Sequence, residues 1–163
     1  MHCLQNEVSG GFSTLVDGFA VAEYIKKNNF QAFESLTTTN LRYQFQDKDI
    51  VLENWGELIE LDKDGDYKQV RYSTRVDYVP PLETEKLKIF YQSRKLLSEL
   101  YCSSEFELRF KLQPGDIMMF DNHRLLHGRT AYDANEGMRH LQGCYLEFDA
   151  TDGKLRHLAR KFK

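Results

Sequence analysis

The sequence predicts an α+β fold in which an antiparallel barrel or sandwich carries helices on its outside. Short segments of alternating apolar and polar residues, separated by turn residues, are typical of strands in such a sheet. Helical patterns stand at the start and in the middle of the chain instead of following every strand. With 163 residues and 41% hydrophobic content, the chain can bury a core of ordinary size. We therefore expect residues 1–163 to form a single domain.

Capping residues and apolar spacing indicate the helices. Asp17 precedes the amphipathic pattern GFAVAEYIKKNN, which predicts an Asp-capped helix, and FQAFESL predicts a second short helix from Phe30 to Leu36. The segment from Leu82 to Tyr101 is rich in helix formers with apolar residues at helical spacing, so it predicts the longest helix. The basic segment GKLRHLARKFK predicts a helical tail.

The strands are expected between and after these helices. LRYQF, IVLENWGELIEL and YKQVRYSTRV are rich in β-formers, and the last two flank a turn at Asp62–Asp66. The Asp64-Gly65 pair in that turn is a hairpin signal. FELRFKL, DIMMFD, LLHGR and RHLQGCYLEFD predict further short strands joined by turns.

Composition excludes several classes of partner. The net charge of −3 provides no basic field that would attract nucleic acid or an anionic membrane surface. No run of about 18 apolar residues occurs, so no membrane span is expected. Cys3, Cys102 and Cys144 are odd in number and include no CxxC pair, which argues against a disulfide framework or a zinc site. We expect a soluble protein in a reducing cytoplasm.

The candidate chemistry lies between Phe120 and Tyr145, where histidine and arginine are concentrated. His127 and Arg139 are 12 positions apart, and they can face inward together if a strand and its returning neighbour carry them. An imidazole suits Fe(II), and a planar guanidinium suits one end of a dicarboxylic acid. A lone histidine is more often a hydrogen-bonded structural residue, so the spacing by itself leaves both interpretations open.

Two longer segments resemble a known family. HCLQNEVSGGFSTLVDGFAVAEYI and PGDIMMFDNHRLLHGR with RHLQGCY resemble the two ends of the oxygenase domain of γ-butyrobetaine and trimethyllysine hydroxylases, within the taurine dioxygenase-like family. The resemblance implies a double-stranded β-helix (jelly-roll) core with flanking helices. It also implies Fe(II) and 2-oxoglutarate as cofactor and cosubstrate, and hydroxylation of a small quaternary ammonium compound such as γ-butyrobetaine.

The resemblance also implies residue roles. His127 corresponds to the distal iron ligand and Arg139 to the arginine that binds the remote carboxylate of 2-oxoglutarate. Ser13 stands where a hydroxyl helps to hold the cosubstrate, although a turn-forming serine after two glycines explains it nearly as well. Tyr145 falls at one wall of an aromatic cage for the trimethylammonium group, and a core aromatic residue is an equally good interpretation.

The sequence departs from the family at two places. The family's HxD iron-binding pair lies upstream of HCLQ, and none of the five histidines here begins an HxD or HxE motif. We therefore expect the C-terminal part of an oxygenase domain, with N-terminal strands missing and no tight iron site. Ser73 and Thr74 replace an Asn-Asn pair that contacts the substrate's anionic end in relatives. A phosphonate or another betaine is thus as reasonable a substrate as γ-butyrobetaine, and a solvent-facing polar pair is the plain alternative.

Four hypotheses remain open at this point. The chain is part of a hydroxylase, a truncated non-catalytic paralogue that acts as a binding or assembly module, an incomplete gene product, or a domain whose His127 and Arg139 are structural. The second hypothesis predicts an open sheet edge, and open edges favour pairing with another chain. A homodimer is its expected consequence.

Overall fold

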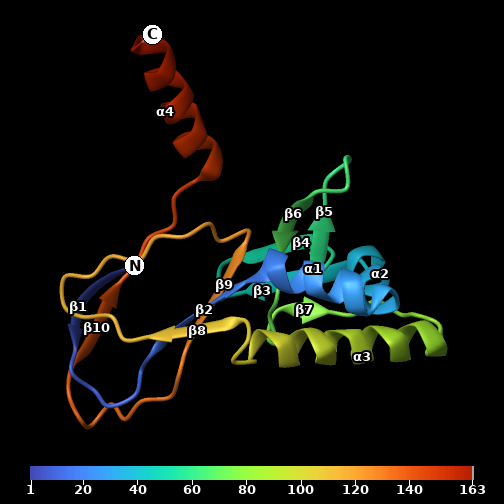
Figure 1. The fold of residues 1–163 in the computed structure, drawn as a ribbon, viewed down its shortest axis with the longest axis horizontal. Helices are drawn as coiled ribbons and strands as arrows, with labels where there is room; N and C mark the ends of the chain where they lie inside the picture. The colour runs from blue at the N-terminus through green and yellow to red at the C-terminus, as the bar shows by residue number, and fades with distance from the viewer. Residues whose placement is uncertain (163) are drawn as a thin grey trace. The chain divides into compact units, whose positions relative to one another are not determined.

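The computed structural model describes residues 1–162 and divides them into two compact units (Figure 1). The central unit contains Gly11–Lys111 and Phe120–Ala131. The terminal unit contains Met1–Gly10, Leu112–Met119 and the described residues from Tyr132 onward. We describe each unit by itself.

Three helices belong to the central unit, and all three were predicted. They are α1 (Gly18–Asn28), α2 (Phe30–Thr38) and α3 (Thr84–Tyr101). The Asp17 side chain accepts hydrogen bonds from the amides of the first turn of α1, which confirms the predicted N-cap. Local capping and apolar spacing were therefore sufficient to locate these helices.

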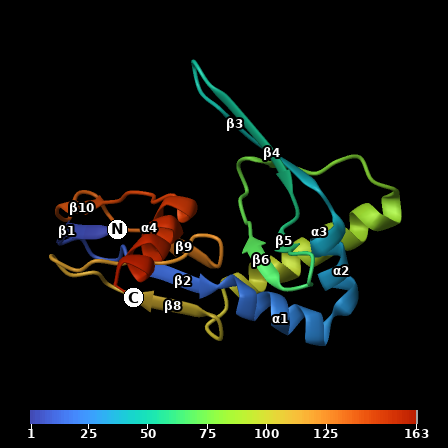
Figure 2. The same ribbon diagram turned by 90° about the horizontal axis from the view of Figure 1, so that it is seen from above.

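The three helices pack together over the hydrophobic core of the central unit (Figures 1 and 2). Their buried faces combine with residues of the nearby strands. The core residues that are almost completely buried include Val21, Ile25, Leu36, Leu41, Leu58, Ile59, Phe90 and Leu97. Helix and strand residues contribute to one hydrophobic cluster, so the neighbouring strands pack against a well-packed core.

A three-stranded antiparallel sheet in the central unit has β2 (Ser13–Asp17) in its middle. β8 (Glu107–Phe110) and β9 (Leu125–Arg129) flank it, and both were predicted as strands. At the end of β2, a Cβ atom on Gly18 would lie 2.3 Å from Val70 Cγ2 and 3.0 Å from the Arg124 carbonyl. Only glycine therefore allows α1 to begin so close to the segment that leads into β9.

The remaining strands of the central unit form two further antiparallel sheets. One has the order β4-β3-β7, with β3 (Leu41–Gln46), β4 (Val51–Gly56) and β7 (Asp77–Tyr78). The other pairs β5 (Ile59–Leu61) with β6 (Tyr67–Val70). Gly65 has φ of +85° in the connecting turn, which confirms the predicted hairpin.

The β-rich segment IVLENWGELIEL forms two strands, β4 and β5, which belong to different sheets. The division follows burial. Leu58 and Ile59 are fully buried in the core, whereas the first five residues of β4 are exposed. Gly56 lies at the break, and the guanidinium of Arg71 packs directly against it.

The terminal unit contains β1 (His2–Asn6) paired antiparallel with β10 (Arg139–Gln142), and the helix α4 (Phe148–Lys161). Its buried hydrophobic residues are Cys3, Val8, Leu112 and Met118. The helical tail was predicted, but α4 starts earlier, where the strand RHLQGCYLEFD was expected to continue. DIMMFD is not a strand, since it contributes only a bridge from Ile117 to His2.

Over residues 1–162, four helices and antiparallel sheets of two or three strands agree with the predicted α+β class. The jelly-roll arrangement and the single domain stay predictions. None of the described helices combines the length and apolar character needed to cross a lipid bilayer.

Candidate functional site

His127 and Ser13 lie on neighbouring strands of the central unit. His127 on β9 stands opposite Leu15 of β2, and Arg129 stands opposite Ser13. Because side chains alternate along a strand, Ser13 and His127 share one face of this sheet as diagonal neighbours. Ser13 is 2% exposed, whereas the imidazole of His127 is open to solvent and tilted against Phe120, with ring centroids 4.9 Å apart. The register therefore brings two of the five predicted site residues together.

Arg139 opens β10 of the terminal unit, directly opposite Asn6 of β1. Its guanidinium carbon lies 5.2 Å from the centre of the Tyr132 ring, a cation–π distance. Its Nε is buried and has no hydrogen-bond partner among the described residues. A buried guanidinium donor without an acceptor raises the free energy of the folded state, and a hydrogen bond to an anionic oxygen would remove this penalty.

Asn6 and Tyr132 surround Arg139, and the sequence did not single out either residue. The Asn6 amide nitrogen donates to the Leu112 carbonyl at 2.8 Å, and its Oδ1 is buried without a partner in the described chain. β1 (HCLQN) has no apolar alternation from which the burial of Asn6 could have been predicted. Tyr132 lies in a turn-rich segment where the residue pattern alone carries no signal either.

Cys3 is the third buried group of the terminal unit near Arg139. Burial raises the pKa of the Cys3 thiol, Asp116 adds to the increase and Arg139 opposes it. The thiol Sγ lies 3.7 Å from the Leu112 carbonyl, the same oxygen that accepts from Asn6. Cys3 therefore stays a neutral thiol in the packing of β1 rather than a reactive thiolate.

Iron needs more ligands than the described residues provide. Within residues 1–162, no three His, Cys, Asp or Glu side chains are grouped so that they could hold a metal ion. β9, which carries His127, pairs with β2, and β10, which carries Arg139, pairs with β1. The donor set thus fits a carboxylate at Arg139, but it does not fit a facial triad of two histidines and a carboxylate.

Ser73 lies in the irregular segment after β6, where the backbone is fixed by Arg94 of α3. Arg94 Nη2 donates to the Ser73 carbonyl at 2.7 Å and lies 2.6 Å from Asp77 Oδ2, whose side chain is 2% exposed. The Ser73 hydroxyl accepts a hydrogen bond from the Arg75 amide at 3.2 Å. The backbone at Ser73 is therefore fixed by the buried Arg94–Asp77 ion pair, while the Ser73 hydroxyl takes part in a local turn.

Tyr145 lies between β10 and α4 and is 84% exposed. The face of such an exposed ring is accessible to a cation, but one ring supplies only one wall of an aromatic cage. The role of Tyr145 therefore stays a prediction.

The turn directly before β9 is fixed by an ion pair between Asp17 and Arg124 of the central unit. Arg124 Nε and Nη2 both donate to the Asp17 carboxylate, and the shortest contact is 2.6 Å. Hydrogen bonding from Arg124 lowers the pKa of Asp17, and the α1 amides that it caps lower it further. The same carboxylate thus starts α1 and fixes the turn before the strand of His127.

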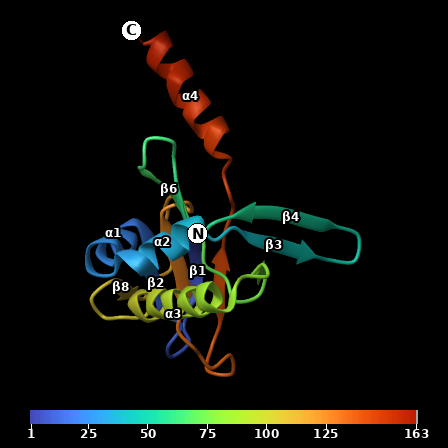
Figure 3. The same ribbon diagram turned by 90° about the vertical axis from the view of Figure 1, so that its right-hand side faces the viewer.

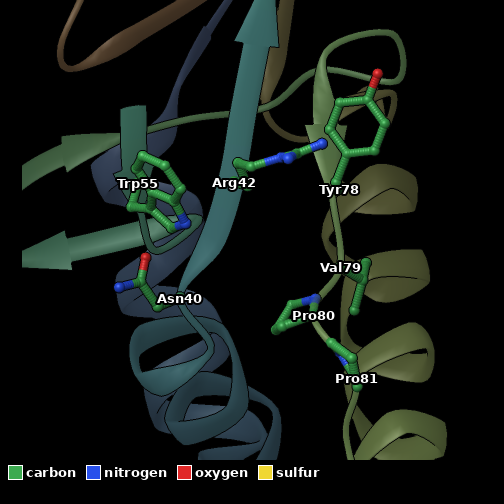
Figure 4. A pocket seen from close by; sticks show the side chains of 7 residues that line it. All are labelled: Asn40, Arg42, Trp55, Tyr78, Val79, Pro80 and Pro81. Carbon is green, nitrogen blue, oxygen red and sulfur yellow. The ribbon is translucent and has the colours of Figure 1, made fainter. Parts of the chain in front are cut away.

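A cavity of about 330 Å³ opens elsewhere in the central unit, between β3, β4 and the segment after β7 (Figure 4). The Arg42 guanidinium points at the Tyr78 ring, 4.9 Å from its centre, and Trp55 lies on the other side of Arg42 (Figure 4). None of the five predicted site residues lines this cavity, whose walls are Asn40, Arg42, Trp55, Tyr78, Val79, Pro80 and Pro81.

Comparisons with known proteins agree over nearly the whole chain. The family model described as "Taurine catabolism dioxygenase TauD, TfdA family" matches residues 1–145. The γ-butyrobetaine dioxygenase of Homo sapiens is 37% identical over 168 residues, covering 99% of this chain and 43% of the relative. The γ-butyrobetaine dioxygenase of Pseudomonas sp. (strain AK-1) is 29% identical, covering 98% and 42%. The mitochondrial trimethyllysine dioxygenase of Bos taurus is 29% identical, covering 91% and 36%. The chain thus spans about two fifths of the length of these relatives.

Proposed function

We propose, from the premise that this chain belongs to the TauD/TfdA family of taurine catabolism dioxygenases, that it carries the cosubstrate-binding portion of an Fe(II)/2-oxoglutarate-dependent hydroxylase. The observation that carries the proposal is the buried, unpartnered Nε of Arg139. 2-Oxoglutarate is a dicarboxylate, and when bound it supplies the oxidisable keto acid that such hydroxylases consume.

Arg139 is suited to hold one carboxylate of this molecule. A guanidinium presents parallel N–H donors that match the two oxygens of a carboxylate, and Nε is one of the donors in that fork. The Tyr132 ring beneath the guanidinium restricts its orientation. The Asn6 side chain, opposite Arg139 in the ladder, adds a fixed polar group beside the same position.

Ser13 is proposed to help hold the cosubstrate through its hydroxyl, and His127 is proposed to bind the metal. Their shared face on β2 and β9 supports this assignment. His127 would supply one imidazole to iron. Because residues 1–162 do not bring two further ligands to it, the complete iron site requires ligands from outside the described residues.

The proposed substrate is a small quaternary ammonium compound. The names of the relatives identify γ-butyrobetaine and trimethyllysine as the compounds on which those proteins act. In this chain, Tyr145 would contact the cation through its ring face, and Ser73 would lie near the anionic end. We propose a cytoplasmic location, which suits three free cysteines, and a homodimer as the assembly.

A non-catalytic binding or assembly module is the second candidate. The absence of a three-residue metal group in residues 1–162 favours it, because oxoglutarate binding by Arg139 does not require iron. The two candidates differ in the products they form. A hydroxylase forms succinate and CO2 when O2, Fe(II), 2-oxoglutarate and γ-butyrobetaine are supplied, whereas a binding module leaves 2-oxoglutarate unchanged.

Calorimetric titration with 2-oxoglutarate tests the shared part of both candidates. We expect Arg139→Gln to weaken binding by at least about tenfold, since a charge-assisted hydrogen bond contributes about 1.5–3 kcal/mol. Arg109→Gln is the matched control, because Arg109 is an exposed arginine on β8 and its loss should leave the affinity unchanged. Equal affinity of the wild type and Arg139→Gln would contradict the assignment. Succinate formation then separates the hydroxylase from the binding module.

A further inference from the structure

β4 is an edge strand of the β4-β3-β7 sheet and is exposed along nearly its whole length. The β3–β4 hairpin extends away from α1, α2 and α3 of the same unit (Figures 2 and 3). The first five residues of β4 are exposed, and Gly56 at its end is buried. This edge is therefore accessible to another strand.

Hydrogen bonds near the hairpin turn show which backbone groups point outward. The Asp47 amide donates to the Ile50 carbonyl at 2.9 Å, which closes the hairpin. Hydrogen-bonded and non-hydrogen-bonded pairs alternate in an antiparallel ladder, so the backbone groups of Val51, Glu53 and Trp55 point away from β3. The Trp55 amide bonds instead to Asn54 Oδ1, at 2.9 Å. A side chain of β4 itself thus satisfies a donor that a partner strand would normally take.

Apart from the Asn54 bond to the Trp55 amide, the common protections of an edge strand are missing from β4. It contains no proline, its register with β3 is unbroken, and its one charged residue is Glu53. The Glu53 carboxylate is already engaged within the hairpin, since it accepts from Gln44 at 2.8 Å and lies 3.7 Å from Arg42. A strand with these properties is open to pairing.

β8 provides a contrast within the same unit. It is also an edge strand, and its Leu108 is 67% exposed. Glu107 and Arg109 flank that leucine with opposite charges, and Arg109 extends 59% of its side-chain surface into solvent. Charges on an edge are a common protection against strand pairing, and β8 carries two charged residues beside its exposed leucine where β4 carries one, so β8 is the better protected strand.

We propose that the β4 edge pairs antiparallel with β4 of a second copy, with Asn54 at the two-fold axis. This inference names a surface for self-association and does not depend on oxoglutarate binding. Centring on Asn54 places Glu53 opposite the partner's Trp55, and these two residues exchange backbone hydrogen bonds across the axis once the Asn54 side chain releases the Trp55 amide. Centring on Glu53 would oppose two carboxylates, and centring on Leu52 would leave only three residues of β4 in the ladder.

The exposed apolar side chains of the hairpin indicate the strength of this dimer. Phe45, Ile50, Val51, Leu52 and Trp55 are each 52–59% exposed and occur on both faces of the hairpin. Their exposed area is roughly 500 Å² per copy, below the about 800 Å² that each partner buries in a standard interface. The dimer should therefore be reversible and depend on concentration.

Light scattering with size-exclusion chromatography tests the surface. We expect the wild-type mass to rise from 19.2 kDa toward twice that value as the concentration increases. Leu52→Lys should hold the protein at the single-chain mass, because it places a charge at the paired edge. Leu108→Lys is the matched control on the better protected edge and should dimerise like the wild type. Circular dichroism should show the same helix content in all three proteins.

A cysteine cross-link tests the register. In a Cys102→Ser/Cys144→Ser background, Asn54→Cys should form a disulfide-linked dimer when diamide is added as the oxidant. Symmetry-related residues of a non-hydrogen-bonded pair lie about 4.5 Å apart at Cα, close enough for a disulfide. Leu108→Cys should form none. A single-chain mass for the wild type at every concentration, as expected if a different segment covers β4, overturns the proposal, and so does a dimer that Leu52→Lys leaves intact.

Discussion

The central and terminal units differ in how much hydrophobic packing supports their proposed site residues. Fourteen buried residues from helices and strands form the core of the central unit, beside the sheet of Ser13 and His127. The terminal unit, which presents Arg139 on a two-stranded ladder, buries four hydrophobic residues. Two-stranded ladders are marginal without further packing. The comparison indicates that the histidine lies on a preformed scaffold, whereas a ligand at Arg139 would add order to its surroundings.

Removing a core ring should produce the largest effect. Phe90 is fully buried on α3, and Phe90→Ala should lower the free energy of unfolding of the central unit by about 3–5 kcal/mol. Denaturant titration followed by tryptophan fluorescence measures it, because Trp55 belongs to this unit. Phe30→Ala removes a ring that is 63% exposed and should cost less than about 1 kcal/mol. Equal costs would show that the α1–α3 core does not stabilise this unit.

Breaking the ion pair behind Ser73 should have the second largest effect. Arg94→Met leaves Asp77 buried without its partner, and the cost should be about 3 kcal/mol in the same titration. Lys95→Met is the control on the next residue, where the ion pair with Glu99 is exposed, and it should cost less than about 0.5 kcal/mol. If Arg94→Met were as mild as this control, the segment around Ser73 would not be fixed by α3.

A smaller change sharpens the contrast with the terminal unit. Val8 is fully buried there, and Val8→Ala removes two methyl groups, at a cost of about 1.5 kcal/mol. We expect faster hydrogen exchange at the amides of β1 and β10 and unchanged exchange in α3. Val51→Ala, at an exposed position, should leave both patterns as they are. Faster exchange in α3 as well would mean that the two units open together.

The smallest effect should come from Asp17, whose contribution depends on pH. Asn also caps helices well, so Asp17→Asn isolates the ion pair with Arg124, which should contribute less than about 1 kcal/mol. The folded-state pKa of Asp17 is lowered, so this stability is present above its unfolded value of about 3.9 and is lost as the pH falls through the lower folded value. The difference between wild type and Asp17→Asn should therefore fade below about pH 4. Arg124→Gln should reproduce it, and a difference that persisted at pH 2 would contradict this cause.

Local signals in the sequence were enough for the helices and the Gly65 turn. The cap at Asp17 and the spacing along α3 are determined by neighbours within a few residues, so the sequence displays them directly. The position of the break between β4 and β5 could not be predicted from the sequence, because it depends on which residues reach the helical core. Leu58 and Ile59 enter that core, and Val51 does not.

Part of the candidate site could likewise be predicted from the sequence, and part depends on strand pairing. Residue types and resemblance identified His127 and Arg139, but Asn6 and Tyr132 are found beside Arg139 only once β1 and β10 are paired. The diagonal placement of Ser13 and His127 likewise depends on the register of β2 with β9. No window of neighbouring residues contains the placement of Asn6 opposite Arg139 or of Ser13 diagonal to His127, because these partners are more than 100 positions apart.

These long-range pairings also determine the order in which a nascent chain can fold. β1 and β2 are synthesised well before β10 and β9, with which they pair, because more than 100 residues separate the partners. The helices and the β3–β4 hairpin use local contacts and can form while the chain is still growing. Between the synthesis of β4 and that of β10, therefore, the growing polypeptide displays a finished hairpin with an open edge before Arg139 exists.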